Sequence, residues 1–212
     1  MAASDSIKHE KQVDFCLALE TYDDAVKDLI YRAALGAPHE SINHTEHFPL
    51  RFKPITVSIK ADQINSDPAP ALYEMCTWLS AQWIHLQGLL RSKESREGQQ
   101  SSAQQQQPPQ TRPPFLPGIL IEGYRWSFVA ATLGEERNEG GWEIIIWTGI
   151  DIGSTESLRG MAQIVAALQI LVDWSISTYG PWFEELISEA GRSSDGRSSA
   201  GSSSSGRDTS GR

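Results

Sequence analysis

Cysteine, long apolar runs and positive charge are all scarce in this 212-residue chain. Its two cysteines, Cys16 and Cys76, each lie within an apolar pattern, which indicates buried thiols in a reducing compartment rather than a disulfide framework. No apolar run approaches the roughly 18 residues that a transmembrane helix needs, so we expect no membrane association. The stretch from Met1 to Lys11 is polar and lacks the apolar segment of a secretory signal peptide. We therefore expect an intracellular protein, in the cytoplasm or the nucleus.

The shortage of positive charge limits any role with nucleic acids. The chain has 18 Lys and Arg against 27 Asp and Glu, a net charge of -9 and a pI near 5.0. Proteins that bind nucleic acid through a broad electrostatic surface are basic. A nucleic-acid role must therefore depend on a local site, and composition alone does not name a function.

Two polar segments dilute a chain that otherwise carries seven tryptophans. The last 22 residues, 191–212, contain 14 Ser or Gly, and they cannot bury enough apolar surface to offset the entropy cost of ordering. Residues 91–114 include four consecutive glutamines and two Pro-Pro pairs, which is typical of a flexible, partly polyproline II insertion. The expected organisation is a disordered N-terminus (1–11), one domain (12–188) that contains the insertion, and a disordered tail (189–212).

Apolar periodicity predicts alternating strands and helices. A period of two predicts strands at 12–19, 54–60, 116–122, 125–132 and 142–147. Helical spacing predicts helices at 22–35 and 68–90, then a long helix capped by Ser154 and ended by Gly180-Pro181, and a short last helix through Leu186. The long helix has a predicted buried stripe of Leu158, Met161, Ile164, Val165, Leu168, Leu171 and Val172. The order βα, βα, βββ, α predicts an α/β (α+β) fold, a mixed central sheet flanked by helices.

The polar faces of the first two strands carry the candidate site. Asp14 lies on the polar face of the first strand and Lys60 on that of the second, and Asp62 shares the face of Lys60 because side chains alternate along a strand. If the two strands are neighbours, these three residues cluster at one end of the sheet. Carboxylates can hold Mg²⁺, and a lysine can steady an attacking water or developing negative charge. The alternative is a solvated strand end with one salt bridge.

Eight short runs keep a common order between Gln12 and Glu185. They lie at 13–17, 41–45, 49–59, 114–117, 126–131, 152–155, 163–169 and 181–183. Together they resemble fungal proteins of the PD-(D/E)XK nuclease superfamily. The resemblance implies a restriction-endonuclease-like core, nucleic acid as a partner, and Mg²⁺ as the cofactor if the protein is active.

The resemblance assigns site roles, and the sequence departs from them. Asp14 matches the first metal-binding acid, but the (Asp/Glu)-x-Lys motif falls on Lys60-Ala61-Asp62, where the two charges are exchanged. A lysine at the acid position repels a cation, and a carboxylate one pleat repeat away, roughly 6–7 Å, does not replace a ligand that must lie about 2.1 Å from Mg²⁺. A glutamine that often follows on the helix falls at Glu74. The candidate catalytic residues are Lys60 and Asp62, and the candidate metal ligands are Asp14 and Asp62.

The front of the chain is a second departure. Only 13 residues precede Asp14, whereas the proteins that it resembles carry a longer N-terminal part with a helix. We therefore expect an N-terminally truncated chain with a bare sheet edge.

Three functions stay open at this stage: a catalytically degenerate nuclease-like domain, a non-catalytic interaction module, and an active metal-dependent nuclease. The charge exchange, the acidic balance and the short front favour degeneracy. His44 and His47 are three residues apart but have no matching Cys/His pair, so we do not expect a zinc site.

Overall fold

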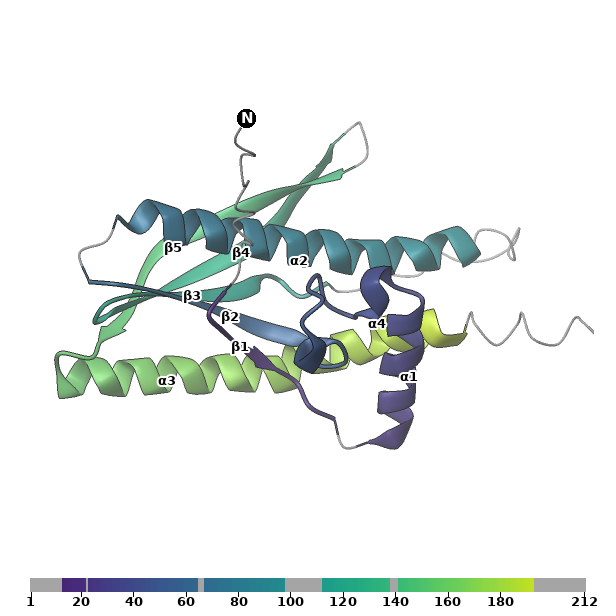
Figure 1. Ribbon diagram of the computed structural model, residues 1–212, viewed down its shortest axis with the longest axis horizontal. Helices are drawn as coiled ribbons and strands as arrows, with labels where there is room; N and C mark the ends of the chain where they lie inside the picture. Colours follow the sequence, from purple (N-terminus) through teal and green to yellow (C-terminus); the bar gives the residue numbers. More distant parts are fainter. Residues whose placement is uncertain (1–12, 22, 65–66, 98–111, 138–140, 193–212) are drawn as a thin grey trace, which may run out of the picture.

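The computed structural model describes residues 13–21, 23–64, 67–97, 112–137 and 141–192 (Figure 1). Its strands are β1 (Phe15–Ala18), β2 (Ile55–Asp62), β3 (Leu116–Glu122), β4 (Arg125–Arg137) and β5 (Gly141–Ser154). Its helices are α1 (Asp24–Leu35), α2 (Pro68–Glu97), α3 (Leu158–Trp174) and α4 (Gly180–Arg192), with short helical turns η1 (Pro38–Glu40), η2 (Phe48–Leu50) and η3 (Ser175–Tyr179).

Some of the predicted boundaries fall outside these residues. The N-terminus (1–11) and most of the tail (193–212), both predicted to be disordered, and most of the predicted insertion (98–111) lie outside the described residues. Helix α2 continues through residues 91–97, so the first part of the predicted insertion is helical. Helix α4 likewise continues to Arg192, into the first residues of the predicted tail.

The five strands form one mixed sheet in the order β1-β2-β3-β4-β5. Strands β2 and β3 are parallel, and the other neighbours are antiparallel. Parallel neighbours need a long crossover connection, and α2 lies within it. Helix α2 covers one face of the sheet, α3 lies along the opposite face, and α1 and α4 lie together at one end (Figure 1). The predicted fold class, a mixed sheet flanked by helices, is confirmed.

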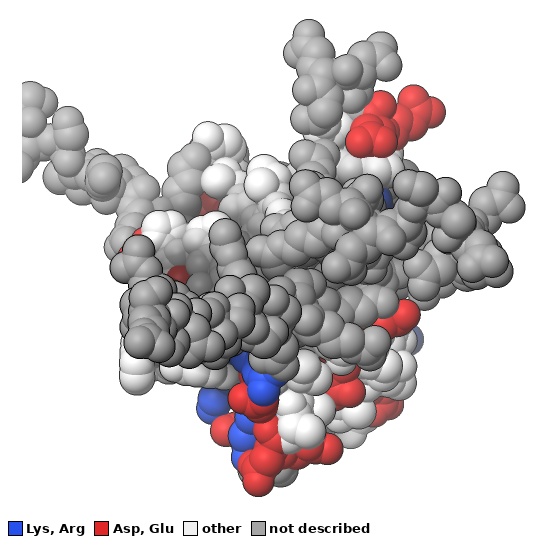
Figure 2. Space-filling view, turned by 90° about the vertical axis from the view of Figure 1, so that its right-hand side faces the viewer, with Lys and Arg blue, Asp and Glu red and all other residues white. Residues whose placement is uncertain are grey.

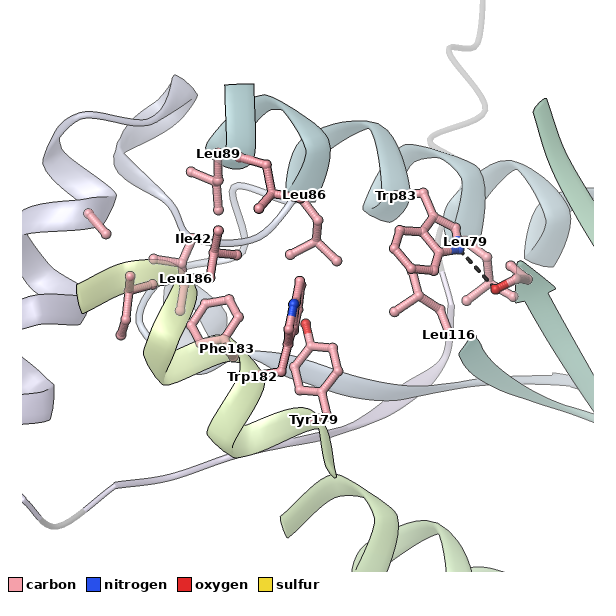
Figure 3. Packing of buried hydrophobic residues seen from close by; sticks show 14 of the residues in the cluster. Ile42, Leu79, Trp83, Leu86, Leu89, Leu116, Tyr179, Trp182, Phe183 and Leu186 are labelled. Carbon is pink, nitrogen blue, oxygen red and sulfur yellow. Dashed lines mark hydrogen bonds between the residues drawn. The ribbon is translucent and has the colours of Figure 1, made fainter. Parts of the chain in front are cut away.

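The main core lies between α2, α4, α1 and the sheet. Helix α2 buries the predicted residues Met75, Leu79, Trp83 and Leu86 almost completely. The indole N–H of Trp83 donates to the carbonyl of Ala131 at 2.9 Å, so this large side chain is buried without losing a hydrogen bond (Figure 3).

Helix α3 differs from its prediction. Ile164 and Leu171 are buried against the sheet, but Leu158, Met161, Val165 and Val172 are exposed, so much of the predicted buried stripe was wrong. A period of 3.6 residues identifies a face of a helix but not what lies opposite that face. The predicted cap was also wrong, because Ser157 and not Ser154 accepts the backbone N–H of Gly160.

The predicted stop at Gly180-Pro181 was wrong as well. The π-helical turn η3 carries the chain from α3 into α4 without a break, and the N–H of Gly180 bonds to the carbonyl of Ser175, five residues back. By length and composition alone, the resulting helix Leu158–Ser188 is able to cross a membrane, and only 22% of its most apolar window is buried. Core helices of soluble proteins pass the same test, so the expected lack of membrane association stays a prediction.

Candidate functional site

Pairing of β1 with β2 brings Asp14 next to Lys60. The register places Phe15 opposite Ile59, and the N–H of Asp14 donates to the carbonyl of Ile59 at 3.0 Å. The Asp14 carboxylate accepts the N–H of Ala61 at 2.8 Å, and the same oxygen lies 3.5 Å from the Lys60 ammonium. Two of the three predicted site residues therefore meet, for the reason expected from strand alternation.

Lys60 has a second acidic partner, which comes from the helix above it. The Lys60 ammonium lies 2.7 Å from a carboxylate oxygen of Glu74 on α2, so it bridges Asp14 and Glu74. Its side chain is only 17% exposed. Burial by itself lowers the pKa of Lys60, but the hydrogen bond with Glu74 and the negative charges of Asp14 and Glu74 outweigh it, so the pKa is raised. The bridging lysine is therefore a fixed cation at neutral pH.

The Glu74 contact belongs to a row of polar contacts between α2 and β2. Glu74, Trp78 and Gln82 are spaced four residues apart, so they share one face of α2. The Trp78 indole donates to the hydroxyl of Ser58 at 2.9 Å, and the Gln82 amide donates to the carbonyl of Ile55 at 2.8 Å. We call Glu74, Trp78 and Gln82 the polar row. It fixes the helix on the strand that carries Lys60.

Asp62 lies at the end of β2, next to Glu122 of β3 in the parallel register. Its carboxylate accepts the N–H of Gln63 at 2.7 Å, and its carbonyl accepts the N–H of Gly123 at 3.1 Å. These contacts are typical of a residue that turns the chain at the end of a strand.

A cavity of about 380 Å³ opens next to Asp14. Residues of β1, the loop before β2 and α2 line it, and its polar members include Asp14, Thr45 and His47. The loop is held in place by Asn43, whose side chain bonds to the carbonyls of Leu50 and Lys53 and to the N–H of Ile55. Asn43 is thus a buried structural residue that shapes the cavity.

His44, on the same loop, packs edge-on against Trp78, with ring centroids 4.3 Å apart. Its two ring nitrogens are buried and have no hydrogen-bond partner in the part of the chain that the structure describes. Burial, reinforced by the charge of nearby His85, lowers the pKa of His44 to about 3. His44 is therefore a neutral side chain next to the site, with its ring nitrogens buried.

The site does not fit Mg²⁺. The position between the Asp14 and Glu74 carboxylates is taken by the Lys60 ammonium, which would repel a divalent cation. In the ranges that the structure describes, no three or more His, Cys, Asp or Glu side chains are placed to hold a metal ion. In this arrangement the two carboxylates bind the Lys60 ammonium in the place that a metal ion would need.

Sequence reasoning found part of this site and missed part. It placed Asp14, Lys60 and Asp62 at one end of the sheet, and it singled out Glu74 only by resemblance. It missed the contact between Glu74 and Lys60 and the roles of Trp78 and Gln82. Their spacing at i, i+4 and i+8, which places them on one face of the helix, was the available signal.

Comparison with known proteins gives one match. A family model described as the PD-(D/E)XK nuclease superfamily matches residues 2–180. No curated protein and no solved structure shows a significant match. The match does not test the expected fungal kinship or the shortened front, which stay predictions.

Proposed function

Because the chain belongs to the PD-(D/E)XK nuclease superfamily, we propose that it keeps the nuclease fold as a non-catalytic module, with the Lys60 ammonium in place of a metal ion. The observation that carries this proposal is the bridge from Lys60 to Asp14 and Glu74, at 3.5 and 2.7 Å. Loss of hydrolysis with retention of the fold is the expected result of that exchange.

An ammonium group can balance the charge of the carboxylates but cannot replace the chemistry of the ion. A bound metal lowers the pKa of a water molecule and polarises the phosphoryl oxygen. The Lys60 ammonium has three N–H donors and no vacant coordination position for water. Asp14 and Glu74 therefore become structural residues in this chain, where through Lys60 they hold β1, β2 and α2 together.

Nucleic acid is the ligand class that the superfamily suggests, and the charge of the chain opposes it. The end of the molecule that carries α1 and α4 shows more acidic than basic surface among its charged side chains (Figure 2). On α1 the exposed acids Asp24 and Asp28 pair with Lys27 and Arg32, and α4 adds the exposed Glu184 and Glu185. Phosphate binding depends on positive charge and weakens steeply with salt. We therefore expect binding of DNA or RNA to be weak at physiological salt, and protein partners are the alternative.

The first experiment restores the family motif. The variant Lys60→Glu/Asp62→Lys removes the bridging ammonium and places a carboxylate between Asp14 and Glu74. We expect calorimetry to show Mg²⁺ binding at least about tenfold tighter than that of the wild type, since each close carboxylate adds to cation affinity. A matched control is Lys53→Glu/Glu20→Lys, which exchanges another ion pair, 3.0 Å long, without changing the net charge.

Cleavage assays complete the test. The wild-type chain, incubated with labelled DNA and RNA and either Mg²⁺ or Mn²⁺, should leave both substrates intact. Cleavage that disappears in Asp14→Ala would show an active nuclease and end the proposal. Mg²⁺ binding by the wild type as tight as that of the double variant would end it too.

A further inference from the structure

A cavity of about 520 Å³ lies between the first residues of α2 and the surface of the sheet. Strands β3, β4 and β5 form its floor, and Pro68, Ala69 and Leu72 of α2 form one wall. Helix α2 begins at the end of the sheet where β3 turns into β4 (Figure 1). We call this space the hairpin cavity. Its volume falls within the roughly 300–1,000 Å³ of small-molecule sites.

Strand pairing determines which side chains line the floor of the hairpin cavity. On β3, Leu120 and Glu122 are two residues apart and share one face of the sheet. The register places Ser127 of β4 opposite Leu120, and Arg125 opposite Glu122. Asp151 of β5 pairs with Ser127 from the other side. One arginine and two acids from three adjacent strands therefore line the same cavity.

The three charged groups of the cavity have no partners among the described residues. In the ranges that the structure describes, the side chains of Glu122, Arg125 and Asp151 form no hydrogen bond and no ion pair. Opposite charges that face each other on neighbouring strands usually pair. Glu122 is also half-buried. Charged groups of both signs are thus available to a ligand in one cavity.

The start of α2 adds no positive charge to the cavity. Pro68 and Pro70 have no backbone N–H, and the N–H of Ala69 donates to the carboxylate of Asp67 at 3.0 Å. Arg125 is the only cationic side chain among the described residues that line the cavity, against two carboxylates. The lining therefore favours a ligand with a net positive charge that also carries one anionic group.

The middle of the cavity is apolar. Leu72 of α2, Leu120 of β3 and Val129 of β4 line it, and the last two are 6% and 1% exposed. An inorganic cation or a bare phosphate would leave this surface without a contact. A hydrocarbon chain between the charged groups of a ligand would cover it and remove water from it.

We propose that the hairpin cavity binds a basic α-amino acid of the lysine type. Its carboxylate pairs with the guanidinium of Arg125, its two ammonium groups pair with Glu122 and Asp151, and its methylene chain covers Leu120. Glu122 and Asp151 lie on the strands that flank β4, about two strand spacings or 9–10 Å apart at the backbone, and their side chains shorten the span. This inference goes beyond the proposed function and does not depend on the loss of catalysis.

A series of three ligands tests the proposal by calorimetry on the full chain. L-lysine should bind with a dissociation constant on the order of 0.1–1 mM, as expected for a small ligand in an open cavity. Cadaverine lacks the carboxylate, and L-norleucine lacks the side-chain ammonium. Each should bind at least about tenfold more weakly than L-lysine, because each loses one charge-assisted contact.

Two variants assign the contacts. Arg125→Gln and Asp151→Asn should each weaken L-lysine about tenfold. Arg125→Gln should not weaken cadaverine, which has no group for the guanidinium, whereas Asp151→Asn should. The matched controls are Arg159→Gln and Asp173→Asn on α3, which should leave L-lysine binding unchanged. All four positions are exposed, so none of these variants should unfold the chain.

Three results would overturn the proposal. One is the absence of L-lysine binding at concentrations up to about 10 mM. Another is cadaverine that binds the wild type as tightly as L-lysine, since Arg125 would then recognise no carboxylate. The third is an equal loss of L-lysine affinity in the cavity variants and in the α3 controls.

Discussion

Helices α2 and α3 cover opposite faces of one sheet and have similar apolar patterns, but they bury their apolar side chains to different extents. Helix α2 buries Met75, Leu79 and Trp83 and adds a polar row that bonds to β2. Helix α3 buries Ile164 and Leu171 and leaves a second apolar face in solvent. Among the residues that the structure describes, one face of the sheet is thus fully covered by α2 and its neighbours, and the other is covered only in part by α3.

The difference teaches that an apolar period does not distinguish a core from an interface. Both require the removal of water from apolar side chains, and the free energy per unit area is the same. The polar row is what marks α2 as internal, because its hydrogen bonds fix one helix rotation on one strand. Helix α3 has no such row toward the sheet among the hydrogen bonds that the described residues show.

The largest contrast should come from tryptophan truncation on the two faces. Trp83→Ala removes a side chain that is 1% exposed, together with its bond to Ala131, and should lower the free energy of unfolding by about 3–5 kcal/mol. Trp147→Ala on β5, where the side chain is 55% exposed, should cost about 1 kcal/mol. Urea unfolding measures both. Equal losses would mean that the two faces are equally closed.

A pH titration tests the same closed face. The pKa of His44 is about 3 in the folded chain and about 6.5 when unfolded, so the unfolded state binds more protons between these values. The contribution of His44 to the free energy of unfolding is therefore fully present above pH 6.5. It falls as the pH drops, by roughly 2 kcal/mol at pH 5. His44→Phe should make this slope shallower. A slope unchanged by His44→Phe would contradict the assignment.

Variants in the polar row should lower stability by a smaller amount, and their losses should not be additive. Trp78→Phe and Ser58→Ala each leave one partner of the 2.9 Å hydrogen bond unpaired, and each should cost about 1–2 kcal/mol. The double variant should cost less than the sum, because no unpaired partner is left. Additive losses would show that the bond does not couple helix to strand.

The smallest effect on stability is expected on the exposed side of helix α3. Val165→Ala should change the free energy of unfolding by no more than about 0.5 kcal/mol, because the Val165 side chain is already exposed to water. Its neighbour Ile164 is 5% exposed, and Ile164→Ala should cost about 2–5 kcal/mol. Comparable losses of unfolding free energy at the two adjacent positions would mean that Val165 is buried in the fold, as Ile164 is.

Much of the fold could be predicted from the sequence because it depends on local patterns. The third predicted strand coincides with β3, and the helix predicted at 22–35 contains α1. The hairpin of β4 and β5 extends further than predicted, to Arg137 and Ser154. Its outer parts pair with shifted registers, which weakens the period-two signal.

The candidate site was predictable only where a single strand pair determines it. Asp14 and Lys60 meet because alternation assigns them one face and the strands are neighbours. The contact of Lys60 with Glu74 needs the rotation of α2 about its own axis, which is set by tertiary packing. The apolar patterns of β2 and α2 do not determine this rotation.

The π-helical turn η3 sets the phase of the last helix. Each residue of an α-helix advances about 100°, so the wider turn rotates α4 by roughly a quarter turn relative to an unbroken α-helix. With this offset, Tyr179, Phe183 and Ile187 all point into the core. Deletion of one residue between 175 and 178 would let the segment close as a regular α-helix and keep that face in the core, whereas insertion of a further residue would turn it by about 100° toward water. The junction therefore tolerates a shorter turn better than a longer one.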